Sequence, residues 1–213
     1  MSSVAAFDSA SSVRQALQAR IGAMQSTKLE EQGFAVLPQL RSLLPRGLRR
    51  GSVYSISGST TLALALVAEA SRQGEWCGVL GEPDVGIEAA AEWGISLDRL
   101  VCVHDGGERW VTTLAAMTDV LGLVIARPPR ALRSLSPAES SRLSARLRQS
   151  RSSVLVLGDW PEAEASLRVA KTEWSGLGAG HGNLGSRRMR IDVRGRGGEG
   201  ALRQATLIVP VRP

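Results

Sequence analysis

Short apolar runs and amphipathic stretches alternate along the middle of the chain. The apolar runs are rich in valine, leucine and isoleucine, which is typical of strands buried on both faces. They cover residues 53–56, 76–80, 100–104, 121–126 and 153–158. Between them, helices are predicted over 62–70, 87–93, 109–120 and 137–150. This alternation predicts an α/β fold with a mostly parallel sheet flanked by helices.

The last third of the chain has a different pattern. A strand is predicted over 167–174, followed by a glycine-rich segment over 175–186. Next, Met189, Ile191 and Val193 alternate with charged residues, which indicates a half-buried strand. A final strand covers 201–209. We expect these C-terminal strands to be antiparallel and to extend the sheet.

A lone amphipathic helix precedes this α/β region and ends near residue 25. Its apolar stripe has helical spacing and consists of Val13, Leu17, Ile21 and Met24. Such a helix can fold back on its own core or dock on another subunit. We therefore divide the chain into an N-terminal helix with linker, residues 1–38, and a core, residues 39–213.

The linker contains one extended apolar piece, residues 34–37, which begins with Phe34. An extended segment of this kind can anchor a chain to a partner by adding a strand to the partner's sheet. It can equally add a strand to the edge of its own sheet. Both interpretations stay open.

Charge and composition suggest macromolecular partners. The 213 residues carry a net charge of +6, with a sequence pI of about 10.5, and arginine supplies nearly all of the positive charge. Arginine suits contacts with phosphate or carboxylate, although a bias toward arginine can also reflect genomic base composition. A basic chain is typical of proteins that bind nucleic acid or acidic proteins.

The other chemistry-bearing residues are few. Cys77 and Cys102 lie in apolar runs without a CxxC pattern, so we expect buried, reduced thiols. His104 and His181 are the only histidines, and we expect no metal site. We find no signal-peptide pattern and no apolar run long enough for a membrane span, so a cytoplasmic protein is expected.

The segment over 51–66 predicts a strand, a tight turn and a helix, the arrangement of a phosphate-binding loop. That loop requires G-x-x-x-x-G-K-[ST], because backbone N–H groups and a lysine surround the phosphates. Here Gly58 is the one glycine of the turn, and Ser59 stands in the place of the lysine. Thr60 and Thr61 remain, and either can cap the helix.

Both lysines of the chain, Lys28 and Lys171, are distant in sequence from this turn. The turn is also too short to wrap a triphosphate. Two interpretations remain: a nucleotide-site scaffold that has lost its nucleotide, or an ordinary strand-turn-helix. Neither predicts a cofactor.

Catalytic patterns are missing elsewhere too. Glu82 and Asp84 follow the second predicted strand, but no nucleophile or base stands at a recognisable spacing. In a phosphate-loop ATPase the strand over 121–126 should end in an aspartate that holds Mg²⁺. Here Arg127 follows it. Without the lysine and this aspartate, the phosphate charge of a transition state has little to neutralise it, so we expect a non-enzyme.

Several segments, taken in order, resemble RecA recombinases. Residues 46–51 resemble the approach to the phosphate loop, and Glu82 matches the glutamate that activates water in that family. Residues 94–100 resemble the G-V-D-x-x-x-L segment of RecA. The glycine-rich segment 176–185, followed by 190–194, resembles the second DNA-binding loop of RecA and the strand after it. The resemblance covers residues 40–195 and implies a RecA-like core.

Among RecA relatives, the chain is most similar to the ImuA family, especially its ImuA′ branch. That resemblance implies a non-catalytic adaptor in SOS mutagenesis and translesion synthesis. Its implied partners are an ImuB-like polymerase-related protein, an error-prone polymerase, RecA, possible copies of itself, and DNA. A cytoplasmic protein that joins the nucleoid after DNA damage is expected.

The resemblance also suggests where contacts lie. In RecA the N-terminal helix and the next strand pack on the neighbouring protomer, which implies partner contacts for Val13, Leu17, Ile21, Met24 and Phe34. The glycine-rich loop and its strand imply DNA or ImuB contacts for His181, Arg187, Arg188, Arg190 and Arg194. The alternatives are a SulA-like inhibitor of cell division and a weak RecA-like ATPase with an unorthodox loop.

Overall fold

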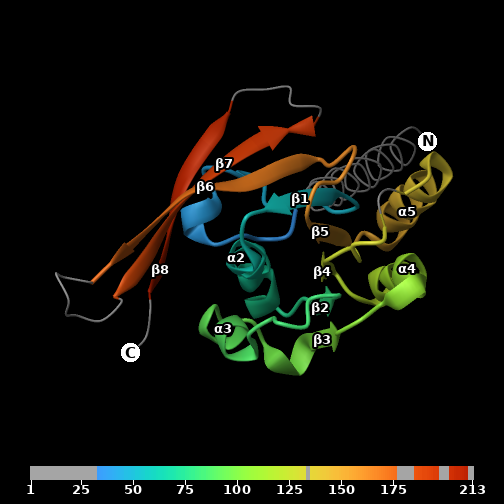
Figure 1. Cartoon of the computed structure of the whole chain (residues 1–213), viewed down its shortest axis with the longest axis horizontal. Helices are drawn as coiled ribbons and strands as arrows, with labels where there is room; N and C mark the ends of the chain where they lie inside the picture. The colour runs from blue at the N-terminus through green and yellow to red at the C-terminus, as the bar shows by residue number, and fades with distance from the viewer. Residues whose placement is uncertain (1–32, 133–134, 177–184, 197–201, 211–213) are drawn as a thin grey trace, which may run out of the picture. The chain divides into compact units, whose positions relative to one another are not determined.

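The computed structural model describes residues 33–132, 135–176, 185–196 and 202–210. Within them one sheet of eight strands runs in the order β3-β2-β4-β5-β1-β6-β7-β8 (Figure 1). The strands are β1 (Val53–Ser57), β2 (Cys77–Leu80), β3 (Leu100–Val103), β4 (Leu123–Ala126), β5 (Ser153–Leu157), β6 (Ala165–Ser175), β7 (Ser186–Gly195) and β8 (Arg203–Pro210). Strands β1 to β5 pair in parallel, and β6 joins β1 in parallel. The predicted mostly parallel sheet is confirmed.

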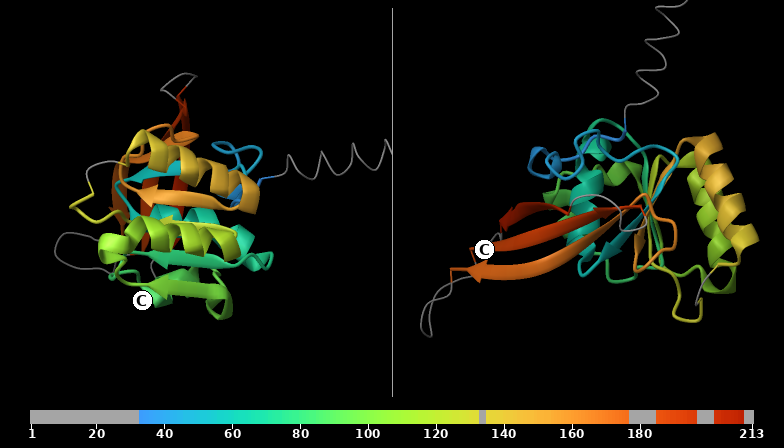
Figure 2. Two further views of the ribbon diagram at one scale, coloured as in Figure 1. Left: turned by 90° about the vertical axis from the view of Figure 1, so that its right-hand side faces the viewer. Right: turned by 90° about the horizontal axis from the view of Figure 1, so that it is seen from above.

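Helices cover both faces of the parallel part (Figure 2, right). One face carries α2 (Thr60–Arg72) and α3 (Ile87–Glu92), and the other carries α4 (Trp110–Val120) and α5 (Pro137–Ser150). Short 3-10 helices are η1 (Pro38–Leu40), η2 (Leu97–Arg99) and η3 (Gly107–Arg109). Alternate side chains of the strands point to opposite faces. In β4, Leu123 therefore belongs to the core under α2, and Val124 belongs to the core under α4 and α5.

The C-terminal strands form a ribbon that continues past the helices (Figure 1). Strand β7 pairs antiparallel with β6 and with β8, as expected. The alternation in β7 is confirmed because Met189, Ile191 and Val193 are buried while their charged neighbours are not. A bulge between Val169 and Lys171 interrupts the β6–β7 register.

The sequence also located most helix boundaries. The capping box of α5 is confirmed: the Ser136 hydroxyl accepts a hydrogen bond from the Glu139 N–H, and the Glu139 carboxylate accepts one from the Ser136 N–H. Helix α2 is different, because its N-cap is Ser59 rather than Thr60 or Thr61. None of the described helices has the length and apolar character needed to cross a bilayer.

Phe34 lies inside the core and does not present its ring to a partner. Its side chain is 1% exposed, and its backbone exchanges hydrogen bonds of 2.7 and 2.9 Å with Leu48. The guanidinium of Arg50 covers the ring at 3.8 Å from its centroid. The partner contact expected for Phe34 is therefore corrected, because burying this ring in its own core leaves no surface to share. The compact unit runs from Phe34 to Pro213, so it begins before the boundary predicted at residues 38–39.

Two sets of predicted residues cannot be placed. The helix with Val13, Leu17, Ile21 and Met24 lies outside the described residues, and so does His181 in the glycine-rich segment. The two thiols are described: Cys77 is buried as expected, whereas Cys102 on the edge strand β3 is partly exposed.

Candidate functional site

The turn between β1 and α2 has the strand-turn-helix geometry expected from the sequence. Gly58 adopts a φ of +91°, a left-handed conformation that favours glycine. Ser59 follows in an extended conformation, and its hydroxyl accepts a hydrogen bond of 3.3 Å from the Leu62 N–H. The residue in the place of the lysine thus caps its own helix.

A hollow of about 550 Å³ opens beside this turn. Its wall is formed by the turn itself, by the carboxyl end of β5 and by two arginines that come from other strands. The lining residues are Ile56, Ser57, Gly58, Ser59, Thr60, Thr61, Arg127, Leu157, Gly158 and Arg187. In open α/β sheets this carboxyl edge is where ligands usually bind.

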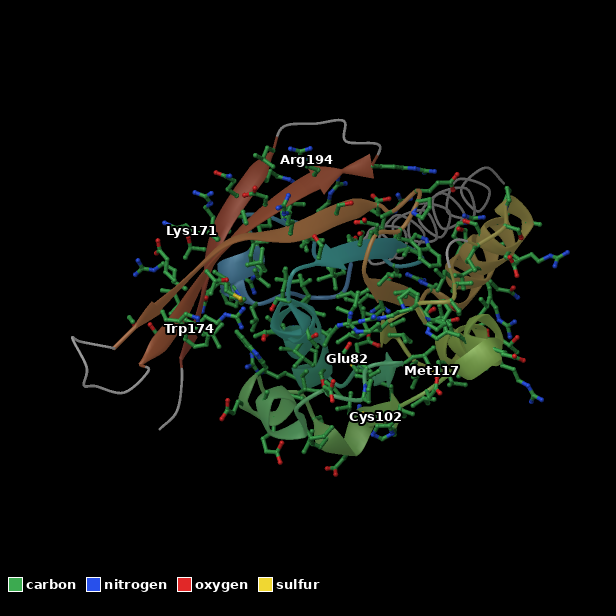
Figure 3. All side chains as sticks on the ribbon, in the orientation of Figure 1. Glu82, Cys102, Met117, Lys171, Trp174 and Arg194 are labelled. Carbon is green, nitrogen blue, oxygen red and sulfur yellow. The ribbon has the colours of Figure 1, made fainter. Side chains whose placement is uncertain are left out.

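One ion pair dominates the edge of this hollow. Glu82 follows β2 and Arg127 follows β4, and because these strands are neighbours their ends meet. The Arg127 Nε donates to the Glu82 carboxylate, and its Nη2 lies 3.4 Å from the Thr60 hydroxyl. Glu82 is buried, at 9% exposure, and the Arg127 side chain is 44% exposed. Figure 3 labels Glu82 at the end of β2.

This pairing changes what the carboxylate can do. A carboxylate that activates water needs a free oxygen directed at the water. In this structure the Glu82 side chain is held by a cation of its own chain, at the place where the RecA resemblance implied water activation. The Glu82 Oε2 is therefore engaged in an internal salt bridge, at a position for which the sequence predicts no catalytic role in this chain.

The outer face of the ribbon collects positive charge. The charged side chains that share this face by register are Arg168, Lys171, Glu173, Arg188, Arg190, Asp192 and Arg194. Lys171 pairs with Glu173 at 2.6 Å, and Gln204 donates to Asp192 at 2.8 Å. The pKa of Glu173 is lowered, chiefly by its hydrogen bond from Lys171 and also by the nearby arginines. Lys171 and Arg194 are labelled along the ribbon in Figure 3.

Four arginines of this outer face have no ion-pair partner within the described part of the chain. They are Arg168, Arg188, Arg190 and Arg194. The outer face has five cations, which are these four arginines and Lys171, and two anions, Glu173 and Asp192. Its net charge is therefore +3. Such a face attracts phosphate groups or carboxylates.

Comparison with known proteins places the chain in a family. The family described as the MT3502 N-terminal domain matches residues 42–162, which is more than half of the chain. The uncharacterized protein Rv3395c of Mycobacterium tuberculosis is 31% identical over 160 residues, covering 71% of this chain and 78% of that protein. The chain belongs to the MT3502 family.

Solved structures show the fold of this MT3502-family protein. The RadB recombinase matches with a TM-score of 0.53 at 18% identity, covering 78% of this chain and 92% of that one. The fold is therefore RecA-like, and its C-terminal strand β7 pairs antiparallel with β6 and β8. SulA from Pseudomonas aeruginosa matches at a TM-score of 0.35 and 16% identity over 50% of this chain. This likeness is too weak to support an argument about function.

The structure separates the predicted site residues of the MT3502-family chain into two groups. Gly58, Ser59, Thr60, Thr61 and Glu82 do come together at one edge. Arg187 lines the same hollow and lies over the Trp174 ring at 5.3 Å, whereas Arg188, Arg190 and Arg194 face outward. Strand alternation explains the split, because successive side chains point to opposite faces.

Sequence reasoning missed the role of Arg127. The sequence identifies Arg127 only as the residue in the place of a Mg²⁺-binding aspartate, although its position also indicates a pairing with Glu82. Arg127 follows β4 as Glu82 follows β2, and parallel strands end at a shared edge. Within the described residues, no three potential metal-ligating side chains gather at this edge or elsewhere.

Proposed function

We propose that the chain is a non-catalytic RecA-like adaptor of DNA-damage-induced mutagenesis, of the ImuA type. It would join an ImuB-like polymerase-related protein and an error-prone polymerase to damaged DNA, with RecA as a further partner. No cofactor would be needed, and the protein would be cytoplasmic until DNA damage brings it to the nucleoid.

The observation that carries this proposal is the Glu82–Arg127 ion pair. A phosphate-loop ATPase neutralises its substrate with a lysine and a metal ion. Here the residue at the lysine position caps its own helix, and the carboxylate that matches the water-activating glutamate of RecA is paired through one oxygen with an arginine. The missing lysine and the pairing of the Glu82 carboxylate with Arg127 both act against ATP hydrolysis. This favours a role through contacts with other macromolecules.

Two surfaces support a role in contacts. The outer face of the ribbon is basic, which suits DNA or an acidic protein. Toward the other edge of the sheet, Trp76 precedes β2, Val101 lies in β3 and Val120 ends α4, with exposures of 46%, 37% and 76%. Exposed large apolar side chains are candidates for protein contacts when they form a patch.

The first experiment tests nucleotide binding. A fluorescent ATP analogue with Mg²⁺ is titrated with the purified chain, and the positive control is a protein with an intact G-x-x-x-x-G-K-[ST] phosphate loop. We expect no saturable binding in the micromolar range. Saturable binding that competes with unlabelled ATP would contradict the non-catalytic assignment and would favour the weak-ATPase alternative.

The second experiment tests the partners. The tagged chain is used to capture an ImuB-like protein, RecA and the polymerising GTPase of cell division, each purified. We expect capture of the ImuB-like protein, of RecA or of both. Capture of the GTPase alone would exclude the adaptor role in mutagenesis.

A further inference from the structure

A groove lies between helix α5 and the segment 158–164, which crosses from β5 to β6. It consists of two hollows that adjoin each other, as shown by the five lining residues that they share. The shared residues are Pro137, Ser140, Trp160, Pro161 and Glu162. The groove is on the α4–α5 face of the sheet, whereas α2 covers the opposite face.

The first hollow is an apolar socket of about 200 Å³. Its walls come from the β4–α5 connection and from the crossing segment. Besides the shared residues, they include Pro128, Leu132, Leu135 and Asp159. Trp160 packs against Trp110 with ring centroids 6.5 Å apart, so the inner wall rests on the buried core.

The size of the socket limits what it can hold. Drug-sized ligands occupy pockets of roughly 300–1,000 Å³, and a cavity of about 150 Å³ holds one benzene ring. A 200 Å³ socket therefore fits a single aromatic or aliphatic side chain. Anchors of this kind carry most of the energy in many protein interfaces.

The second hollow is a basic trough of about 440 Å³. It contains four arginines, of which Arg49 pairs with Glu164 at 3.2 Å and Arg50 pairs with Glu75 at 2.6 Å. The other two, Arg148 and Arg196, line the trough without an ion-pair partner among the described residues. They are both exposed, so their guanidinium groups are available to an incoming anion.

The groove is held in shape by its own backbone. Glu162 has a φ of +61°, a left-handed conformation that non-glycine residues seldom adopt unless the surroundings impose it. At the other end Gly51 allows α5 to approach closely, because a Cβ there would lie 3.1 Å from the Arg148 Cα. A preformed groove loses less freedom on binding than a flexible one.

We propose that this groove binds an extended segment of a partner protein, with one aromatic or aliphatic anchor in the socket and acidic residues in the trough. Glu162 lines both hollows, but Asp159 lines only the socket, so acidic residues on the socket side are repelled. The acidic flank therefore follows the anchor on one side only, toward Arg148 and Arg196. This proposal rests on the proposed function only in requiring a protein partner.

A peptide fits better than a nucleotide for two reasons. Asp159 and Glu162 line the socket, and their negative charge opposes a phosphate bound next to a stacked base. The socket walls, largely proline, leucine and tryptophan, also offer few groups to pair with the edge of a base. Single-stranded DNA binding is thus the competing outcome of the test.

The test uses a panel of fluorescein-labelled eight-residue peptides and the full chain. Each peptide carries one anchor (Phe, Trp, Tyr, Leu, Ile or Met) with three aspartates either before or after it. Control peptides replace the anchor by glycine or the aspartates by asparagine. We expect one orientation to bind, and both controls to weaken binding at least tenfold.

Five tryptophans allow the site to be identified in one nuclear magnetic resonance spectrum. The indole N–H signal of Trp160, assigned by its loss in Trp160→Phe, should shift when the best peptide is added. The signal of Trp174, which is exposed on the C-terminal ribbon away from α5 (Figure 3), should stay in place. This readout separates binding in the groove from binding to another basic surface.

Two variants change the groove without touching the core. Ser140→Trp fills the socket mouth from the surface of α5, and Arg148→Glu reverses charge in the trough. Each should weaken peptide binding at least fivefold. The matched control is Arg142→Glu, an exposed arginine of the same helix that lines neither hollow, and it should bind as the parent does.

Three results would overturn the proposal. One is the absence of saturable binding below about 1 mM across the whole panel. Another is peptide binding that Ser140→Trp and Arg148→Glu leave unchanged. The third is a shift of the Trp160 signal by oligo-dT but not by any peptide. If the groove proposal fails while ImuB-like protein is still captured, the adaptor role stands and uses another surface.

Discussion

Removal of the Arg127 side chain should destabilise the fold, because it leaves the Glu82 carboxylate without its partner. Breaking a fully buried ion pair costs about 3–5 kcal/mol, and an exposed pair contributes about 0–1 kcal/mol. The Glu82 side chain is 10% exposed and the Arg127 side chain is 44% exposed, so the pair lies between these limits. We expect Arg127→Met to lower the free energy of unfolding by about 2 kcal/mol.

A double-mutant cycle isolates the pair. Glu82→Gln keeps the shape and an acceptor oxygen, and should cost about 1 kcal/mol. The double variant should cost less than the sum of the two, with a coupling energy of about 1 kcal/mol. Urea unfolding followed by circular dichroism measures all four proteins. The control is Arg130→Met, an exposed arginine without an ion-pair partner among the described residues, which should change stability by less than about 0.5 kcal/mol.

Strict additivity would refute the reasoning. If the two single losses sum to the loss of the double variant within about 0.3–0.5 kcal/mol, the ion pair contributes nothing measurable. A loss from Arg127→Met no larger than that from Arg130→Met would have the same meaning. Either result would remove the internal salt bridge as the explanation for the site.

The other predictions concern DNA, partners and thiols. Arg188→Ala with Arg190→Ala should weaken retention on single-stranded DNA and lower the slope of log affinity against log salt by about 2, one for each lost phosphate contact; no binding by the parent would contradict a DNA role. Leu17→Asp or Ile21→Asp should weaken partner capture at least tenfold while the melting temperature is unchanged; unfolding would instead mean that the helix packs on its own core. Burial raises the pKa of Cys77 from 9.0 to about 12, so Cys77 in the folded protein should resist alkylation at pH 8, as read by mass spectrometry of the peptide that contains it. Stability linked to this thiol is complete below pH 9 and is lost as pH rises toward 12, because only the unfolded chain releases the proton, and Cys77→Ala should flatten that decline.

The local pattern of the sequence was sufficient for most of the fold. Strand and helix positions follow from periodicity, as Met189, Ile191 and Val193 show in β7. The Ser136 capping box likewise fixed the start of α5. These features depend on neighbours in sequence, where spacing alone decides which face is buried.

The missed features depend on contacts between distant residues. Phe34 is 14 residues from Leu48, and nothing in its local pattern distinguishes a free strand from one paired with its own chain. Arg127 contacts Glu82 because β2 and β4 are neighbours in the sheet. The order of strands in a sheet cannot be predicted from the local sequence of either strand. The groove beside α5 required the crossing segment and Trp160 to be placed in space before it could be recognised.

Because Arg127 belongs to the same polypeptide as Glu82, the charge balance at this edge of the sheet does not depend on a dissolved ion. A metal ion or a small ligand occupies its site according to its concentration in the surrounding solution. Arg127 is attached to the same polypeptide, so its local concentration at Glu82 is set by chain geometry and does not fall on dilution or dialysis. The charge balance at the ends of β2 and β4 is therefore built into the molecule.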